Sequence, residues 1–476
     1  MATDRVRAAV LVTIAMIFAV VIPSSAQTFT SLHSFTGTDG SNPYAPLVQS
    51  SAGTLYGTTS AGGADSGGSV FKITTAGKLT TVYSFCALAS CADGTDPRSP
   101  VVQATNGSFY GTTWGGGPFS SPGTIFKLTS SGTFTSLYTF CALSGCTDGE
   151  APSGGLVQAV SGTLYGTTSS FGAHGGGTVF SYALSGGSPT TLYNFCSLSE
   201  CADGDSPQAT LIQGTDNNLY GTTYGGGAFT YYGTLFKLTT TGTFSTLHSF
   251  DGTDGDEPIG GMFQAKDGNY YGTTQTDGAN GYGTVFKTTS GGTLTTLYNF
   301  CMLSACADGS FPEDGLIQGT DGKLYGTTFT GGAFGKGTIF NITTAGVLTT
   351  LHSFDSTDGS EPWGGLVQDT NGTFFGTTYA GGTSNLGTVY SLSMGLKSFI
   401  KVQPAAAKVG ATVTILGTKL TGATKITFNK IAAVTYKVVS SSEITVTVPS
   451  GATTGPVVVT APAGTFSTYP NFRIIK

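Results

Sequence analysis

Short runs of alternating hydrophobic and polar residues, separated by glycine-rich turns, follow one another along most of this chain. In the first complete unit, four such runs are Leu47–Gln49, Thr54–Thr59, Ser69–Thr74 and Thr81–Phe85. Glycine pairs and single glycines between the runs are typical of tight turns. Because no stretch repeats its apolar residues with a helical period, the pattern predicts short β-strands throughout.

The segment Leu-Tyr-Gly-Thr-Thr, with small variations, recurs seven times at a spacing of 50–55 residues. Its glycines are Gly57, Gly111, Gly166, Gly221, Gly272, Gly326 and Gly376. A fixed period of this length indicates a repeat architecture. Four short strands per unit make a blade of a β-propeller, so we predict an all-β, seven-bladed β-propeller over residues 29–393. An open β-solenoid is the alternative, but it would need shorter coils and capping ends.

The two ends of the repeat region are complementary. The segment Leu32–Phe35 resembles a fourth strand but precedes the first complete unit, whereas the last unit stops after its third strand at Val389–Leu392. We therefore expect the N-terminal strand to complete the seventh blade, so that chain from both ends closes the ring.

The seven Leu-Tyr-Gly-Thr-Thr copies resemble the GloVer tandem repeat of secreted bacterial proteins, over roughly residues 29–393. The resemblance implies an extracellular location and carries no established activity. Kelch-like propellers share the period, but their paired glycines stand in a different strand context.

The composition changes after Met394, which predicts a linker at 394–398 and a second domain at 399–476. Turn signals every 8–12 residues predict a small β-sandwich there. The segment is similar to an IPT/TIG domain of the immunoglobulin-like class, and Pro449–Gly455 matches the late turn of that family. The resemblance implies a spacer or stalk. Arg473 is the only arginine of this segment, which argues against a DNA-contacting version.

Residues 1–26 are predicted to be a signal peptide. Arg5 and Arg7 precede the apolar run Ala8 to Ile22, and small residues end the segment at Ala26. A membrane anchor is the alternative, but the run is shorter than the ~20 residues of a spanning helix. We expect a secreted or extracellular protein, with cell-surface association left open and no transmembrane segment in the mature chain. With 10% charged residues and a net charge of −6, nucleic acid is not an expected partner.

Eight cysteines form four pairs of identical spacing: Cys86/Cys91, Cys141/Cys146, Cys196/Cys201 and Cys301/Cys306. In a secreted protein such pairs predict local disulfides. A metal site is the alternative, but one pair supplies too few ligands and the propeller holds the pairs apart. Units without cysteine lack four residues at the same place, so the bridges are expected to pin long loops.

Each unit also carries an Asp-Gly-x-x-Pro motif, beginning at Asp39, Asp93, Asp148, Asp203, Asp254, Asp308 and Asp358. We interpret it as a turn in which Asp caps, Gly takes a positive φ and Pro leads into the next strand. A calcium site would need more spaced carboxylates. Further carboxylates nearby predict a solvated acidic rim: Asp96, Glu150, Asp205, Asp256, Glu257, Glu313, Asp314 and Glu361. His33, His248 and His352 alternate with tyrosines of other units, which favours packing over catalysis. We expect no catalytic residues, no cofactor and no metal.

Long loops place the candidate function on one face. In an up-and-down sheet, the loops after the second and fourth strands emerge together, on what we call the loop face, and the short turns emerge on the opposite turn face. Candidate ligand-binding residues on the loop face are Trp114, Tyr224, Phe329, Trp363 and Tyr379. Flat aromatics beside carboxylates suit sugar rings, although they could equally just cover loop backbone.

We therefore expect an extracellular, non-catalytic binding or adhesion module for a carbohydrate or a cell-surface ligand. The partner would be a glycan or an extracellular protein, and the oligomeric state is open. A secreted polysaccharide-active hydrolase or lyase and a purely structural surface scaffold are the alternatives.

Overall fold

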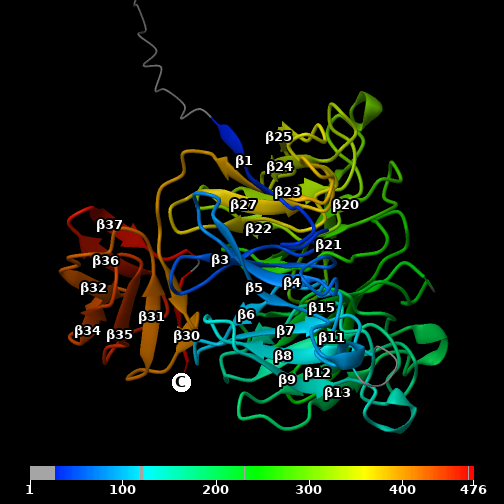
Figure 1. Ribbon diagram of the computed structural model, residues 1–476, viewed down its shortest axis with the longest axis horizontal. Coiled ribbons are helices and arrows are strands. Elements are labelled where there is room, and N and C mark those ends of the chain that lie inside the picture. Colours follow the sequence, from blue (N-terminus) through cyan, green and yellow to red (C-terminus); the bar gives the residue numbers. More distant parts are fainter. Residues whose placement is uncertain (1–26, 118–121, 230, 470, 476) are drawn as a thin grey trace, which may run out of the picture.

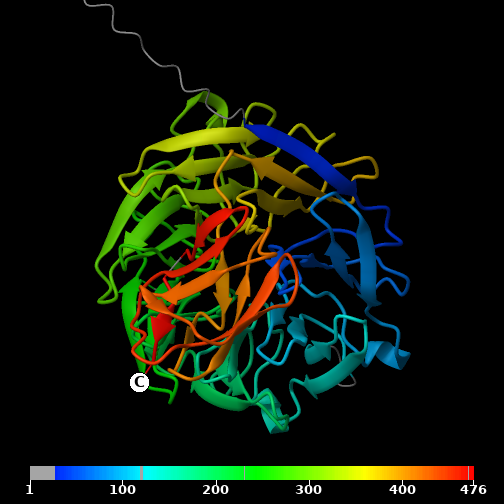
Figure 2. The same ribbon diagram turned by 90° about the vertical axis from the view of Figure 1, so that its left-hand side faces the viewer.

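The computed structural model describes residues 27–117, 122–229, 231–469 and 471–475, so the predicted signal peptide lies outside the described residues. Seven four-stranded antiparallel sheets stand around a common centre, like the blades of a propeller, and a β-sandwich follows them. Figure 2 shows the ring with the sandwich in front of it. The all-β prediction with a propeller and an immunoglobulin-like sandwich is confirmed.

The first strand of each sheet is two residues long. These strands are β2 (Val48–Gln49), β6 (Val102–Gln103), β10 (Val157–Gln158), β14 (Ile212–Gln213), β18 (Phe263–Gln264), β22 (Ile317–Gln318) and β26 (Val367–Gln368). The terminal glutamine of each accepts a hydrogen bond from a turn of the preceding sheet, as Gln103 Oε1 does from Ser51 N at 2.7 Å. The series closes where Gln49 Oε1 accepts from Thr370 N at 3.3 Å. Neighbouring sheets are thus linked side chain to backbone around the whole ring.

The second strands carry the Leu-Tyr-Gly-Thr-Thr segments and are buried along their whole length. They are β3 (Leu55–Thr59), β7 (Phe109–Thr113), β11 (Leu164–Thr168), β15 (Leu219–Thr223), β19 (Tyr270–Thr274), β23 (Leu324–Thr328) and β27 (Phe374–Thr378). The glycine at their centre is required by packing. A Cβ on Gly57 would lie 2.4 Å from the ring of Phe71 in the third strand, and the other copies repeat this contact.

The third and fourth strands complete each sheet. The third strands are β4 (Ser69–Ile73), β8 (Thr124–Leu128), β12 (Thr178–Tyr182), β16 (Thr234–Leu238), β20 (Thr284–Thr288), β24 (Thr338–Ile342) and β28 (Thr388–Ser393). The fourth strands are β5 (Leu79–Ser84), β9 (Phe134–Thr139), β13 (Thr190–Asn194), β17 (Phe244–Ser249), β21 (Leu294–Asn299), β25 (Leu348–Ser353) and, from the N-terminus, β1 (Thr28–Ser34). The outermost strands are only partly buried, as expected for a ring whose inner strands are covered on both faces.

The N-terminal strand β1 closes the ring. It pairs antiparallel with β28, with Phe29 opposite Leu392 and Ser34 opposite Thr388. The seventh sheet therefore has the order β1-β28-β27-β26, with chain from both ends. The predicted closure is confirmed.

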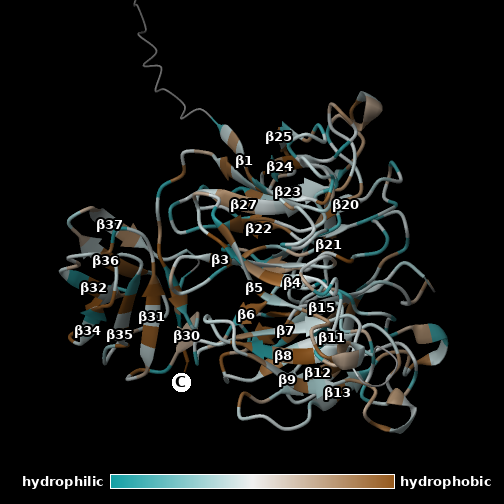
Figure 3. Cartoon of the chain, in the orientation of Figure 1, coloured by the Kyte–Doolittle hydropathy of each residue, from teal (hydrophilic) through white to brown (hydrophobic). Residues whose placement is uncertain are grey.

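Apolar side chains from neighbouring sheets pack together between them. One such cluster joins Tyr110 and Phe140 of the second sheet to Leu164 and Phe180 of the third, all at most 1% exposed. Figure 3 shows these hydrophobic stretches along the strands of the ring and of the sandwich. Because every sheet contributes to the clusters on both sides, the core is a continuous band around the ring.

The C-terminal sandwich has two four-stranded sheets. One has the order β29-β31-β35-β34, the other β33-β32-β36-β37, and β30 and β38 form a parallel pair. The strands are β29 (Lys401–Gln403), β30 (Ala406–Ala407), β31 (Thr412–Leu416), β32 (Lys425–Phe428), β33 (Ile431–Ala432), β34 (Tyr436–Val438), β35 (Glu443–Thr447), β36 (Val457–Ala461), β37 (Gly464–Ser467) and β38 (Arg473–Ile474). Its core includes Ile415, Phe428 and Val459.

The sandwich is attached to the turn face of the ring. Arg473 donates to Gly214 O and to Asn217 Oδ1, both at 2.8 Å, and the buried Lys401 Nζ donates to Gln368 O at 2.8 Å. Figure 1 shows the sandwich on the left of the ring and short 3₁₀ helices at the opposite, right-hand end. These helices are η1 (Ala89–Cys91), η2 (Ser144–Cys146), η3 (Ser199–Cys201) and η4 (Ser304–Cys306). Among the described residues, the sandwich therefore contacts the face opposite the loop face. Within the described ranges, none of the helices has the length and apolar character needed to cross a bilayer.

Candidate ligand-binding site

The Asp-Gly-x-x-Pro loops meet the ends of the second strands on the loop face. The glycine of each motif has a positive φ, from 87° at Gly149 to 139° at Gly359, as the sequence predicts. A Cβ on Gly40 would lie 2.4 Å from Thr59 Oγ1, the last threonine of Leu-Tyr-Gly-Thr-Thr, and the other copies repeat this contact. The two repeated motifs are therefore two halves of one contact.

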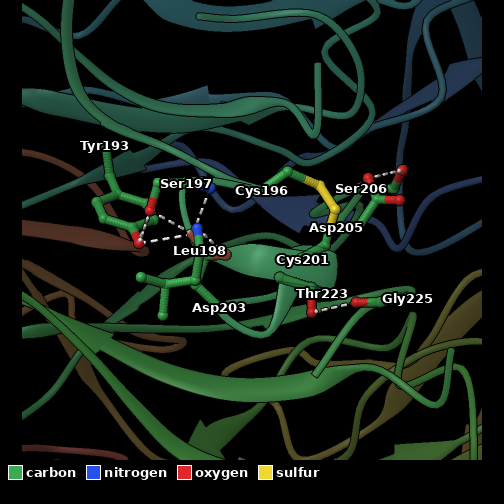
Figure 4. Close-up of a disulfide and its surroundings, with 10 residues drawn as sticks. All are labelled: Tyr193, Cys196, Ser197, Leu198, Cys201, Asp203, Asp205, Ser206, Thr223 and Gly225. Atoms are coloured by element: carbon green, nitrogen blue, oxygen red, sulfur yellow. Dashed lines mark hydrogen bonds between the residues drawn. A yellow bond between two sulfur atoms is a disulfide. The ribbon is translucent and has the colours of Figure 1, made fainter. Parts of the chain in front are cut away.

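The aspartate of each motif accepts a hydrogen bond from the tyrosine or histidine near the end of a fourth strand. The seven pairs are Tyr83–Asp93 (2.8 Å), Tyr138–Asp148 (2.7 Å), Tyr193–Asp203 (2.7 Å), Tyr298–Asp308 (2.7 Å), His33–Asp39 (2.8 Å), His248–Asp254 (2.6 Å) and His352–Asp358 (2.8 Å). Backbone N–H groups of the same loop donate to the aspartate as well; Asp203 also accepts from Ser197 Oγ (Figure 4). The tyrosines and histidines thus hold loops.

Disulfides close the four longer loops at the predicted pairs, Cys86–Cys91, Cys141–Cys146, Cys196–Cys201 and Cys301–Cys306. Figure 4 shows one of them beside the aspartate that the loop surrounds. Two groups in the described part of the chain combine such cysteines with a carboxylate, Glu150 or Asp205, at metal-ligand distances. Because their cysteines are oxidised to disulfides, they lack the thiolates that a metal would need.

The residue before each proline adopts a left-handed backbone conformation, although none of them is glycine. These residues are Asn42, Asp96, Ala151, Ser206, Glu257, Phe311 and Glu361, with φ between 53° and 58°. This conformation costs about 1–2 kcal/mol per residue. The same conformation thus recurs at one position of every unit, directly before the proline.

The residue after each proline lines one central pocket of ≈ 240 Å³. The seven residues are Tyr44, Arg98, Ser153, Gln208, Ile259, Glu313 and Trp363. The motif that precedes them is the same in every unit, whereas these seven side chains are all different. The framework is therefore symmetric, and the pocket is not.

Beyond this position the chain is mostly small, which keeps the pocket open. The next residue is Asp314 in the sixth unit and Ala, Ser or Gly in each of the other units. The Asp314 carboxylate accepts from Gly315 N and Gly365 N, both at 2.6 Å, so it is directed to backbone. Desolvation raises its pKa to about 6. A second cavity of ≈ 130 Å³ is lined by residues further along the same segments. Its walls are mainly apolar and include Met262 and Leu366.

The rings of Tyr44 and Trp363 form an aromatic wall of the central pocket, and two further rings pack against Trp363. Trp363 lies 4.4 Å from Tyr44, 5.1 Å from Phe329 and 5.8 Å from Tyr379, centroid to centroid. Phe329 and Tyr379 are the residues that follow Thr-Thr in their units. The four rings therefore come from four different loops.

Two charged contacts flank this wall. On one side Arg98 stacks over Trp114 at 4.1 Å and forms an ion pair with Asp96 at 2.7 Å. On the other side Tyr224 donates to Glu257 Oε1 at 2.5 Å. The hydrogen bond to Glu257, together with desolvation, raises the pKa of Tyr224 to about 12.

Glu313 is the buried carboxyl of the pocket. It is 5% exposed, and Gln275 Nε2 donates to its Oε1 at 2.7 Å. Its Oε2 has no hydrogen-bond partner among the described residues. Desolvation, with smaller contributions from the negative charges of Glu257 and Asp314, raises its pKa to about 8. The prediction of a solvated acidic rim is therefore wrong for Glu313, because its carboxyl packs in the pocket lining against Gln275.

The five aromatic residues singled out from the sequence all lie on the loop face, but in three places. Phe329 and Tyr379 each contact Trp363, which lines the pocket, whereas Trp114 is under Arg98 and Tyr224 is beside Glu257. The other lining residues at this position were not predicted from the sequence: Tyr44, Arg98, Ser153, Gln208, Ile259 and Glu313. An alignment of the seven units on Asp-Gly-x-x-Pro would have found them, because the next position is the one that varies most in chemistry.

The comparisons with known proteins agree with this architecture. The Gloeobacter/Verrucomicrobia repeat model matches residues 16–158, 141–318 and 232–434, and the IPT/TIG domain model matches 398–474. No curated protein matches the chain.

Similar solved structures include a novel fungal alcohol oxidase of the AA5 family in complex with copper. It has 14% identity and a TM-score of 0.51, and the match covers 94% of this chain and 99% of that one. Another is a structural genomics protein of unknown function from Bacteroides thetaiotaomicron, with 13% identity, a TM-score of 0.43, and coverage of 77% and 76%. Likeness at this identity concerns the fold alone. The repeat model spans well over half of the residues, and the chain belongs to the Gloeobacter/Verrucomicrobia repeat family.

Proposed function

We propose that this protein is a non-catalytic glycan-binding module whose site is the central pocket of the loop face. The repeats, the IPT/TIG domain and the four disulfides fit an extracellular β-rich module. The observation that carries the proposal is the position after each proline. Seven copies of the same Asp-Gly-x-x-Pro turn place seven different side chains in the lining of one pocket.

The chemistry of these side chains suits a sugar. Trp363 and Tyr44 offer ring faces for the apolar side of a pyranose, and Ser153, Gln208 and Glu313 offer hydrogen-bond partners for hydroxyls. At ≈ 240 Å³ the pocket is below the about 300–1,000 Å³ of drug-sized sites. We therefore expect one sugar unit of a longer glycan to enter it.

A glycan array and polysaccharide pull-downs with the purified protein test this proposal. Trp363→Ala should weaken binding of a retained glycan by about tenfold or more, the effect of losing 1.4 kcal/mol. Phe334→Ala is the matched control, because Phe334 is 62% exposed on a long loop and does not line the pocket. Equal affinities for the wild type and Trp363→Ala would contradict the proposal.

A polysaccharide-active enzyme is the second candidate, favoured by the raised pKa of Glu313 alone. A carboxyl that keeps its proton near neutral pH has the property of a general acid. Its sequence neighbour Asp314 is engaged by two backbone N–H groups and offers no second free carboxylate. Release of new reducing ends from a bound polysaccharide, lost in Glu313→Gln, would favour the enzyme.

A further inference from the structure

Glu313 gives the central pocket a buried polar atom that lacks a hydrogen-bond partner among the described residues. The atom is Oε2, and the side chain is 5% exposed and lines the pocket. A buried polar atom without a partner costs about 1–3 kcal/mol. A ligand that forms a hydrogen bond with this carboxyl recovers that free energy, and a cationic donor can do so by displacing the carboxyl proton.

The charges around Glu313 favour a donor that is positively charged. Glu257 and Asp314 act on the Glu313 carboxyl, and Asp256 lies beside Glu257. Desolvation raises the pKa of Asp256 to about 6. The titratable hydroxyls that face the group are those of Tyr44 and Tyr224.

Arg98 is the basic residue of the pocket lining; it lies 5.8 Å from the Tyr44 ring centroid, and most of its charge is directed to Asp96. Its guanidinium is paired with Asp96 at 2.7 Å and stacked over Trp114. The pair is neutral as a whole. Glu313, by contrast, has an amide as its protein partner.

The aromatic wall adds a second attraction for a cation. Tyr44 and Trp363 line the same pocket as Glu313, with ring centroids 4.4 Å apart, and Glu313 is close enough to act on the Tyr44 hydroxyl. The face of an aromatic ring attracts ammonium groups, by about 0.5–2 kcal/mol. A buried carboxyl beside such faces is a combination that favours an amine over a hydroxyl.

We infer that the central pocket selects a sugar bearing a free, cationic amino group, with the ammonium held between Glu313 and the rings of Tyr44 and Trp363. This rests on the proposed glycan-binding function. On binding, the protonated Glu313 carboxyl releases its proton to solvent, and the resulting carboxylate accepts hydrogen bonds from the ammonium. No other bond forms or breaks.

Three tetrasaccharides with the same β-1,4-linked gluco backbone test the inference directly. They carry at C2 an ammonium (chitosan tetraose), an acetamide (chitin tetraose) or a hydroxyl (cellotetraose). In calorimetric titrations at pH 5.5, where the C2 amine is protonated, we expect the ammonium form to bind about 10–100-fold more tightly than the other two, as for a hydrogen bond to a charged group. In buffers of different ionisation enthalpy, its binding should release protons.

Two variants separate the site from general attraction of a cationic ligand to an acidic protein. Glu313→Gln keeps the shape and should reduce the preference for the ammonium form to below about threefold. Glu200→Gln, which removes an exposed carboxylate from η3 on the same face, should leave it unchanged.

The remaining outcomes are distinct. Equal binding of all three sugars, or an ammonium preference that survives Glu313→Gln, overturns the amino-sugar inference and leaves the glycan proposal standing. Binding of none of the three overturns the inference. If the glycan array is also negative, the proposed function falls with it.

Discussion

Gln275 Nε2 donates to Glu313 Oε1 at 2.7 Å, and the two residues come from adjacent units of the ring. Gln275 follows Thr-Thr of β19, and Glu313 follows the proline that precedes β22. The same two positions meet where Phe329 packs on Trp363 at 5.1 Å. Each side chain that enters the pocket can therefore be held by a side chain of the preceding unit, so the pocket can be varied without altering the frame.

Glu313 should make the stability of the protein depend on pH. Its pKa is about 8 in the folded protein against 4.5 for the free group, so between these values the folded state holds a proton that the unfolded chain has released. The free energy of unfolding therefore falls as the pH rises through this window. Asp314 and Asp256, with pKa values raised to about 6, act in the same direction up to that pH.

Glu313→Gln should flatten this decline, most clearly between pH 6 and about 8, where Glu313 alone of the three still titrates. Thermal unfolding of both proteins at several pH values measures it. A parallel decline in the wild type and the variant would show that Glu313 ionises normally.

The tyrosine–aspartate pairs should stabilise the loops by different amounts. Tyr83→Phe removes a hydrogen bond to the fully buried Asp93, which keeps two backbone donors, and should cost about 1–2 kcal/mol. Tyr193→Phe should cost less, because Ser197 Oγ still donates to Asp203 at 2.8 Å. Chemical denaturation compares the two variants. A larger loss for Tyr193→Phe would contradict the proposed role of Ser197.

The glutamines that end the first strands should be important for holding the sheets together. Gln213→Leu leaves Val160 N without its acceptor at 2.9 Å and should cost about 1–3 kcal/mol. Gln49→Leu should cost more, since Gln49 is 5% exposed and bonds to both Asp369 and Thr370 at the closure of the ring. Equilibrium unfolding in urea measures both, and indistinguishable small losses would argue against this role.

Reduction of the four disulfides should loosen loops and leave the sheets intact. Each bridge closes a short loop, and the chain-entropy estimate is roughly 2 kcal/mol per bridge. The apolar clusters between sheets contain no cysteine among their described members. Far-UV circular dichroism should therefore be unchanged by a reductant while the melting temperature falls. Loss of the β signal on reduction at 25 °C would contradict this.

The fold could be predicted from the sequence because each unit repeats the same local contacts. The glycine of Leu-Tyr-Gly-Thr-Thr packs on a third-strand phenylalanine, or on Tyr390 in the seventh sheet, and the glycine of Asp-Gly-x-x-Pro packs on the final threonine. Such contacts leave one residue type at a position, and identical residues at a fixed period are easy to recognise. The closure by β1 followed from counting strands.

The candidate site could be predicted only in part, for the opposite reason. Lining positions such as Tyr44, Gln208 and Glu313 share no residue type, so they were not recognised as a set. Aromatic character pointed to Trp363 and Phe329, because large rings on loops are conspicuous. Two residues before Glu313, Phe311 adopts a left-handed backbone conformation. Bulky residues rarely adopt it, so the sequence did not indicate this turn or the burial of Glu313.

The central claim is that a glycan enters the pocket, and Trp363 can report on it directly. The chain has two tryptophans, Trp114 and Trp363. In a Trp114→Phe variant, Trp363 is the sole tryptophan and lines the pocket. Titration with the glycan retained in the array should change its fluorescence saturably, with the same Kd as calorimetry gives. Calorimetric binding without any change in Trp363 fluorescence would place the ligand elsewhere and contradict the account.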